Sequence, residues 1–135
     1  MSLTALLYVG CGGALGAMSR YAVSIFLARH GAILPLGTLV SNLAGCFIMG
    51  ALMQWLAEAN WLEGTTAANE HYRLLFAVGF CGSFTTLSAL VYEMSSLINF
   101  NQAMQAAAYL LASVAGGFLC FFAGIYLARA VLPTP

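Results

Sequence analysis

The sequence has very little charge. Only 6% of its 135 residues are Asp, Glu, Lys or Arg, and lysine is absent altogether. A soluble domain has about a quarter of its residues charged, so this composition argues against a soluble protein. The chain is 62% hydrophobic, with a mean hydropathy of +0.93. Such values are typical of a protein that lies mostly within a lipid bilayer.

The residue sets that enzymes use are also missing. The sequence offers no Ser-His-acid set, no pair of carboxylates on one helix face and no phosphate-binding glycine loop. Its four cysteines, Cys11, Cys46, Cys81 and Cys120, fall one in each hydrophobic stretch and lack the short paired spacing of zinc sites. Cysteine is also a small apolar packing residue. We therefore predict that the chain is not an enzyme, does not bind nucleic acid and uses its cysteines for packing.

Four apolar stretches are long enough to cross a bilayer, which takes about 20 residues per helix. They cover, approximately, residues 3–28, 36–57, 73–98 and 102–131. The first has no basic segment before it and is too long for the core of a signal peptide, so we expect it to be retained. We predict an all-α membrane protein, a single four-helix transmembrane domain over residues 1–135, in contact with lipid in the cell membrane.

The basic residues give a weak signal for orientation. With four spans, Arg73 and Arg129 fall on one side of the membrane and Arg29 on the other, while Arg20 lies within the first span. Orientation follows the Lys/Arg imbalance between the two sides, and here that imbalance is one residue. We therefore predict dual topology, with two copies of the chain forming an antiparallel homodimer.

A polar segment interrupts the third stretch. Residues 82–86 read Gly-Ser-Phe-Thr-Thr, and Ser88 follows. Backbone groups freed by a broken helix are tolerated in lipid only where protein or a water-filled cavity satisfies them. Membrane proteins bind ions at such breaks. We predict that the third helix is broken at mid-membrane and that the break is an ion site.

Three polar side chains in the spans are costly to place in lipid and so are candidates for function. Arg20 either extends to the interface or pairs with a carboxylate or carbonyl, or it attracts anions. Asn42 either forms a hydrogen bond between helices or binds a ligand. Glu93 either belongs to an ion pair or interface, or lines an ion path.

Small residues also mark close helix contacts in lipid. Gly12 and Gly16 form a GxxxG pattern in the first span, and the last span has a stripe of Ala112, Gly116, Cys120 and Gly124. Packing within the chain and packing between two copies both remain open for these patterns.

Three motifs in order resemble the Fluc (CrcB) fluoride channel family. Residues 12–21 resemble the opening of that family, residues 37–50 its second-helix motif, and residues 79–86 with Ser88 its broken third helix. The resemblance covers nearly the whole chain and is weakest in the fourth span. It implies a fluoride-selective channel, with two pores along the interface of an antiparallel dimer. Passive fluoride efflux through it would lower fluoride toxicity in the cytoplasm.

The resemblance also implies roles for particular residues. A structural sodium ion, not transported, would lie at the dimer centre, held by the backbone carbonyls of Gly82 and Thr85 of each subunit. Asn42 matches a pore-lining amide, and Arg20 matches a basic residue near the pore entrance. Fluoride is a strong hydrogen-bond acceptor, so its path must supply donors in place of water. The remaining residues that we assign to this path are Thr86, Ser88, Glu93, Tyr109 and Ser113.

The chain departs from the family pattern at the pore. The family usually has Thr-Thr-Phe-Ser-Thr-Phe where this chain has Thr-Thr-Leu-Ser-Ala-Leu, so Leu87 and Leu90 replace two pore-lining phenylalanines. Gly117 and Phe121 stand at two further positions that usually carry hydroxyls. Aromatic ring edges are electropositive, and leucine has none. An alternative is therefore a non-conducting or weakly conducting subunit that pairs with a more typical homologue. A third hypothesis, a proton-coupled drug exporter, needs a carboxylate in the first span, which has Arg20 instead.

Overall fold

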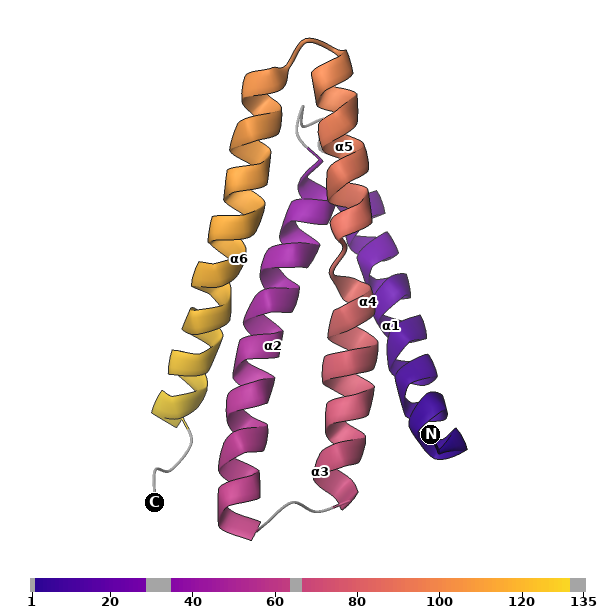
Figure 1. Cartoon of the computed structure of the whole chain (residues 1–135), viewed down its shortest axis with the longest axis vertical. Coiled ribbons are helices and arrows are strands. Elements are labelled where there is room, and N and C mark those ends of the chain that lie inside the picture. The colour runs from indigo at the N-terminus through magenta and orange to yellow at the C-terminus, as the bar shows by residue number, and fades with distance from the viewer. Residues whose placement is uncertain (1, 29–34, 64–66, 132–135) are drawn as a thin grey trace.

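The structure is a computed structural model and describes residues 2–28, 35–63 and 67–131. Its elements, all helical, are α1 (Leu3–Ala28), α2 (Leu36–Glu63), α3 (Ala67–Tyr72), the π-helix η1 (Arg73–Cys81), α4 (Gly82–Phe84), α5 (Leu87–Asn99) and α6 (Ala103–Val131) (Figure 1). Four segments have the length and apolar composition to cross a membrane: Leu3–Ala28, Leu36–Glu58, Asn69–Asn99 and Ala103–Val131. The prediction of an all-α protein with four membrane-spanning segments is confirmed.

The spans alternate in direction along the bundle (Figure 1). α1 and the run from α3 to α5 point one way, and α2 and α6 point the other way. α2 and α6 form the most extensive helix pair, and α1 packs mainly on η1 and to a lesser extent on α2 and α4. The short connection between α5 and α6 makes them antiparallel neighbours, with Asn101 at φ 58°, a left-handed conformation that asparagine tolerates. Arg29, which entered the orientation argument, lies outside the described residues.

The helices extend further than the apolar stretches. α2 ends at Glu63 rather than near residue 57, and helical structure before the third span begins at Ala67 rather than near residue 73. Hydropathy locates the part of a helix that lies in lipid, but a helix can continue into the polar interface. The predicted bounds 36–57 agree with the membrane-spanning part of α2, Leu36–Glu58, while the third spanning segment begins at Asn69 rather than near residue 73.

The π-helix η1 was not predicted. Its hydrogen bonds join residues i and i+5, a geometry that is rare and often found at functional sites. Glycines bring α1 close against it: a methyl group at Gly12 would overlap the carbonyl oxygen of Leu75, and one at Gly16 would overlap that of Phe80. The GxxxG pattern of α1 thus packs within the chain.

A small core joins α5, α6 and α2. Leu90, Leu97, Ala106 and Tyr109 are buried together, with Leu39 and Met94 packed against them. Many large apolar side chains on the outside of the helices are exposed, as lipid-facing residues of a membrane protein are. This core holds α5 in place on one side of the polar segment of the third span.

Candidate functional site

Two residues separate α4 from α5. Thr85 (φ −82°, ψ 153°) and Thr86 (φ −153°, ψ 124°) have extended backbones. Gly82, at φ −62° and ψ −29°, is still helical. The non-helical part of the polar segment is therefore limited to these two residues, which we call the α4–α5 junction.

Asn42 of α2 binds the backbone of the α4–α5 junction through both ends of its carboxamide. Its Nδ2 donates to the carbonyl oxygen of Thr86 at 3.2 Å, and its Oδ1 accepts from the N–H of Thr86 at 2.7 Å. Gly45, one turn further along α2, permits this approach, because a methyl group there would overlap Cγ2 of Thr85. Of the two interpretations of Asn42, the hydrogen bond to a neighbouring span is the one that the structure shows.

The hydroxyls of the α4–α5 junction cap the helices on either side. Thr86 Oγ1 accepts from the N–H of Ala89 at 3.2 Å and lies 3.1 Å from Ser88 Oγ. This is an N-cap of α5. Thr85 donates to the carbonyl oxygen of Cys81 from both its N–H, at 3.0 Å, and its Oγ1, at 2.9 Å. Side chains from the junction itself therefore fix where α4 ends and α5 begins.

Arg20 of α1 reaches the same region. Its Nε donates to the carbonyl oxygen of Ser83 at 3.2 Å. Of the interpretations of Arg20, pairing with a carbonyl is the contact that the structure shows. A guanidinium is always charged, so it places a fixed positive charge beside the α4–α5 junction.

The carbonyl oxygens of Gly82 and Thr85 have lost their usual helical donors. In a continuous helix these oxygens would accept from the N–H groups of Thr86 and Ala89, four residues on. Those N–H groups instead donate to Asn42 Oδ1 and Thr86 Oγ1. Backbone carbonyls at unwound helix segments are the groups that bind Na⁺ in membrane proteins. The residues present therefore fit the sodium site that the family resemblance implies.

A second polar cluster joins α2, α5 and α6 around Glu93. Thr38 Oγ1 donates to Glu93 Oε1 at 2.7 Å, and the Tyr109 hydroxyl donates to Oε2 at 2.6 Å. Tyr109 is only 1% exposed. Neither partner of Glu93 is basic, so its contacts differ from the ion pair considered for it. Thr38 was not among the predicted site residues, although it lies four residues before Asn42 and therefore on the same helix face.

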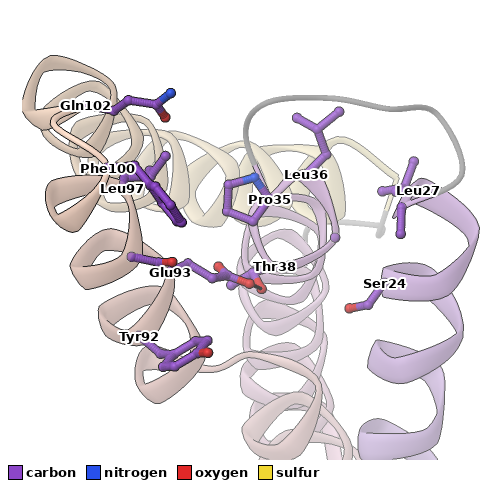
Figure 2. A pocket seen from close by; sticks show the side chains of 13 residues that line it. Ser24, Leu27, Pro35, Leu36, Thr38, Tyr92, Glu93, Leu97, Phe100 and Gln102 are labelled. Carbon is purple, nitrogen blue, oxygen red and sulfur yellow. Dashed lines mark hydrogen bonds between the residues drawn. The ribbon is translucent and has the colours of Figure 1, made fainter.

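Glu93 and Thr38 also line a cavity of about 600 Å³ between the adjoining ends of α1, α2 and α5. Figure 2 shows the Glu93 and Thr38 side chains directed toward each other, with Ser24 on α1 facing them and Tyr92 nearby. Hydroxyl and carboxyl groups thus face an open space at one end of the bundle.

Three other residues that were predicted to belong to the site, Ser113, Leu87 and Leu90, lie outside these two polar clusters. Ser113 is 7% exposed, and its Oγ, like that of the fully buried Ser41, has no hydrogen-bond partner among the described residues. Leu90 is 3% exposed and belongs to the core, whereas Leu87 is 70% exposed. Leu87 and Leu90 therefore lie in different environments, one at the surface and one in the core. No pattern in the sequence indicates that Ser41 is fully buried, because its neighbours depend on how the helices pack.

Two positions of α6 complete the comparison with the family pattern. Gly117 is buried, and a methyl group there would lie 3.3 Å from Cys46 Sγ. The ring of Phe121 packs edge-to-face on Phe122, with centroids 5.8 Å apart. Both positions therefore serve helix and ring packing within the single chain.

Four helices are long and apolar enough to make a multi-pass membrane protein. Polar groups that are hydrogen-bonded inside such spans are typical of proteins that move ions or small solutes across the bilayer. Comparison with known proteins makes this more specific. The family described as "CrcB-like protein, Camphor Resistance (CrcB)" matches residues 7–125, and the chain belongs to this family.

Individual relatives match over almost the full length. A protein of Chlorobium phaeobacteroides (strain BS1), named Fluoride-specific ion channel FluC, is 42% identical over 125 residues, which are 93% of each chain. Proteins of the same name from Caulobacter sp. (strain K31) and Hahella chejuensis (strain KCTC 2396) are 42% and 41% identical. They match over 96% and 98% of this chain, and over 98% and 100% of their own lengths. The family is one of ion channels, so the prediction that the chain is not an enzyme is confirmed.

Proposed function

We propose that this chain is a fluoride-selective channel that lets fluoride leave the cell passively and so lowers fluoride toxicity in the cytoplasm. The observation that carries the proposal is the near full-length similarity to proteins named fluoride-specific ion channels, at 36–42% identity. Hydrofluoric acid enters a cell as a neutral molecule and ionises at neutral pH. A selective exit for the anion then protects the cell.

The polar groups of the spans suit a small anion that accepts hydrogen bonds strongly. Fluoride must exchange its water for donors along the path. The chain offers the hydroxyl of Thr86 at the α4–α5 junction and that of Ser88 in the first turn of α5. It also offers the Oγ of Ser113, which has no partner among the described residues, and the second N–H of Asn42. The fixed charge of Arg20 favours anions nearby, whereas the Glu93 carboxylate is covered by two donated hydroxyls. These groups are our proposed fluoride path, with Tyr109 as one of the hydroxyls that cover Glu93.

The proposed assembly is an antiparallel homodimer with a structural sodium ion at its centre. The weak orientation signal supports insertion in both directions. The carbonyl oxygens of Gly82 and Thr85, freed from helical hydrogen bonds, would bind the ion together with their counterparts in a second copy. Carbonyl ligands are neutral, so a bound ion would keep its positive charge and would join the two subunits at this point.

A second candidate function follows from Leu87. This side chain is 70% exposed where the family usually has a pore-lining phenylalanine. An aliphatic side chain offers fluoride no electropositive edge. The alternative is a non-conducting or weakly conducting subunit that pairs with a more typical homologue in a heterodimeric fluoride channel.

A fluoride-release assay tests the proposal. Purified protein is reconstituted in liposomes loaded with potassium fluoride, and release is followed with a fluoride electrode after valinomycin carries out the compensating potassium. Rapid release that greatly exceeds the release of chloride is the expected result. Vesicles that contain correctly inserted protein and remain fluoride-tight would refute conduction by the homodimer. Co-purification of differently tagged chains then distinguishes a homodimer from a pair with a homologue.

A further inference from the structure

One backbone donor at the α4–α5 junction is diverted by a side chain from another helix. The N–H of Thr86 would bind the carbonyl of Gly82 if the helix continued. It instead donates to Asn42 Oδ1 at 2.7 Å. The second bond of the same amide, from Nδ2 to the Thr86 carbonyl at 3.2 Å, fixes the peptide on both sides of Thr86. Asn42 therefore holds this donor away from Gly82.

A second donor is diverted within the α4–α5 junction. The N–H of Ala89 would bind the carbonyl of Thr85 in a continuous helix. It instead donates to Thr86 Oγ1 at 3.2 Å, as in an N-cap. The extended conformation of Thr86 places its hydroxyl over the first turn of α5. The two diverted donors are the helical partners of the two carbonyls in the proposed sodium site.

We propose that Asn42 and Thr86 are positioning residues of that sodium site, which keep the carbonyl oxygens of Gly82 and Thr85 free to bind a cation. This inference rests on the proposed function, which includes the ion. Without either side chain, an unpaired N–H in a low-dielectric interior is costly, and the nearest acceptor is the carbonyl that it would use in a helix. A carbonyl oxygen that accepts a hydrogen bond is a weaker ligand for a cation, and its direction is fixed by the helix.

Only some of the carbonyl oxygens in this segment accept hydrogen bonds from side chains in the contacts described. Arg20 Nε donates to the oxygen of Ser83, and Asn42 Nδ2 donates to the oxygen of Thr86. The oxygens at positions 82 and 85 have no such side-chain donor in these contacts. Side chains therefore satisfy some carbonyls of the segment and release others, which determines the oxygens that a cation can reach.

The test measures sodium binding without fluoride. The full-length protein in detergent is unfolded by heat in a series of sodium concentrations, with N-methylglucamine keeping the ionic strength constant. A ligand at concentration c that binds only the folded state stabilises it by RT ln(1 + c/Kd), so the unfolding midpoint begins to rise where the sodium concentration reaches its dissociation constant, and the series gives that concentration. We expect Thr86→Val to raise that concentration about tenfold or more, because the sodium ion would lose one favourable ligand contact. The matched control Thr86→Ser keeps the capping hydroxyl and should stay near the wild-type value.

A second pair of variants tests Asn42 independently. Asn42→Leu loses the acceptor for the N–H of Thr86 and should also need about tenfold more sodium. Asn42→Asp keeps a carboxylate oxygen as acceptor and should need no more sodium than the wild type. Folded Thr86→Val and Asn42→Leu proteins with the wild-type sodium dependence would overturn the inference. A wild-type protein whose stability ignores sodium would instead overturn the sodium site itself, while fluoride release tests the channel separately.

Discussion

The close packing of Gly45 in α2 against the α4–α5 junction gives a direct prediction. Gly45 is buried, and a methyl group there would overlap Thr85 Cγ2 and lie 3.2 Å from Phe84 Cδ1. Rotation of the Thr85 side chain would relieve the overlap. It would also break the bond from Thr85 Oγ1 to the Cys81 carbonyl, at 2.9 Å, and a hydrogen bond contributes about 0.5–1.5 kcal/mol. The other response is a shift of α2, and overpacking of this kind costs about 1–3 kcal/mol.

We therefore expect Gly45→Ala to lower the free energy of unfolding by about 1–3 kcal/mol. The measurement is reversible unfolding in mixed micelles, followed by tryptophan fluorescence. Gly10→Ala is the matched control, because it makes the same change in a helix where nothing lies within 4 Å. Alanine is favoured over glycine in a helix by about 1 kcal/mol at most, so the control should be unchanged or slightly stabilised. Equal stability of the two variants would refute the close packing of Gly45 on Thr85.

Leu90→Phe should destabilise the protein by about 1–3 kcal/mol because Leu90 is 3% exposed, whereas Leu87→Phe, at a 70% exposed position, should change stability by less than about 0.5 kcal/mol. If Leu87 lines the fluoride path, Leu87→Phe should also preserve or raise fluoride release, and a clear fall would place the path elsewhere. Tyr109→Phe and Thr38→Val each remove a hydroxyl that donates to Glu93 and should each cost about 1.5–3 kcal/mol in the same unfolding measurement. Since both hydroxyls bind one carboxylate, the double variant should deviate from the sum, and strict additivity would contradict a shared cluster.

Much of the fold was predictable because lipid imposes a simple length rule. Each span needs about 20 apolar residues, and so few charged residues leave little choice in placing four of them. The polar segment in the third span was also visible, since hydroxyl residues beside a glycine are unusual in an apolar run. The structure places Thr85 and Thr86, the two extended residues, inside that segment.

The contacts of the site were less predictable, because they depend on how the helices pack. Leu87 and Leu90 are three residues apart and so lie near each other around α5, yet only Leu90 is covered by α6. The π-helix η1 has no marker in composition, because its apolar residues would suit an α-helix equally well. Hydropathy also gave no sign that α2 continues to Glu63.

The glycines and the polar contacts of the α4–α5 junction belong to one arrangement. An extended stretch inside an apolar span is stable only if neighbouring groups satisfy its backbone. Asn42 from α2 does so at Thr86, and Arg20 from α1 binds the carbonyl oxygen of Ser83 just before this stretch. Both side chains form direct hydrogen bonds to the backbone of the third span, so their helices must lie close to it. Gly16 lets α1 approach Phe80, and Gly45 lets α2 approach Thr85. The small residues of these helices therefore explain how donors and acceptors reach the junction, and substitution of such a glycine should disturb the polar contacts along with the packing.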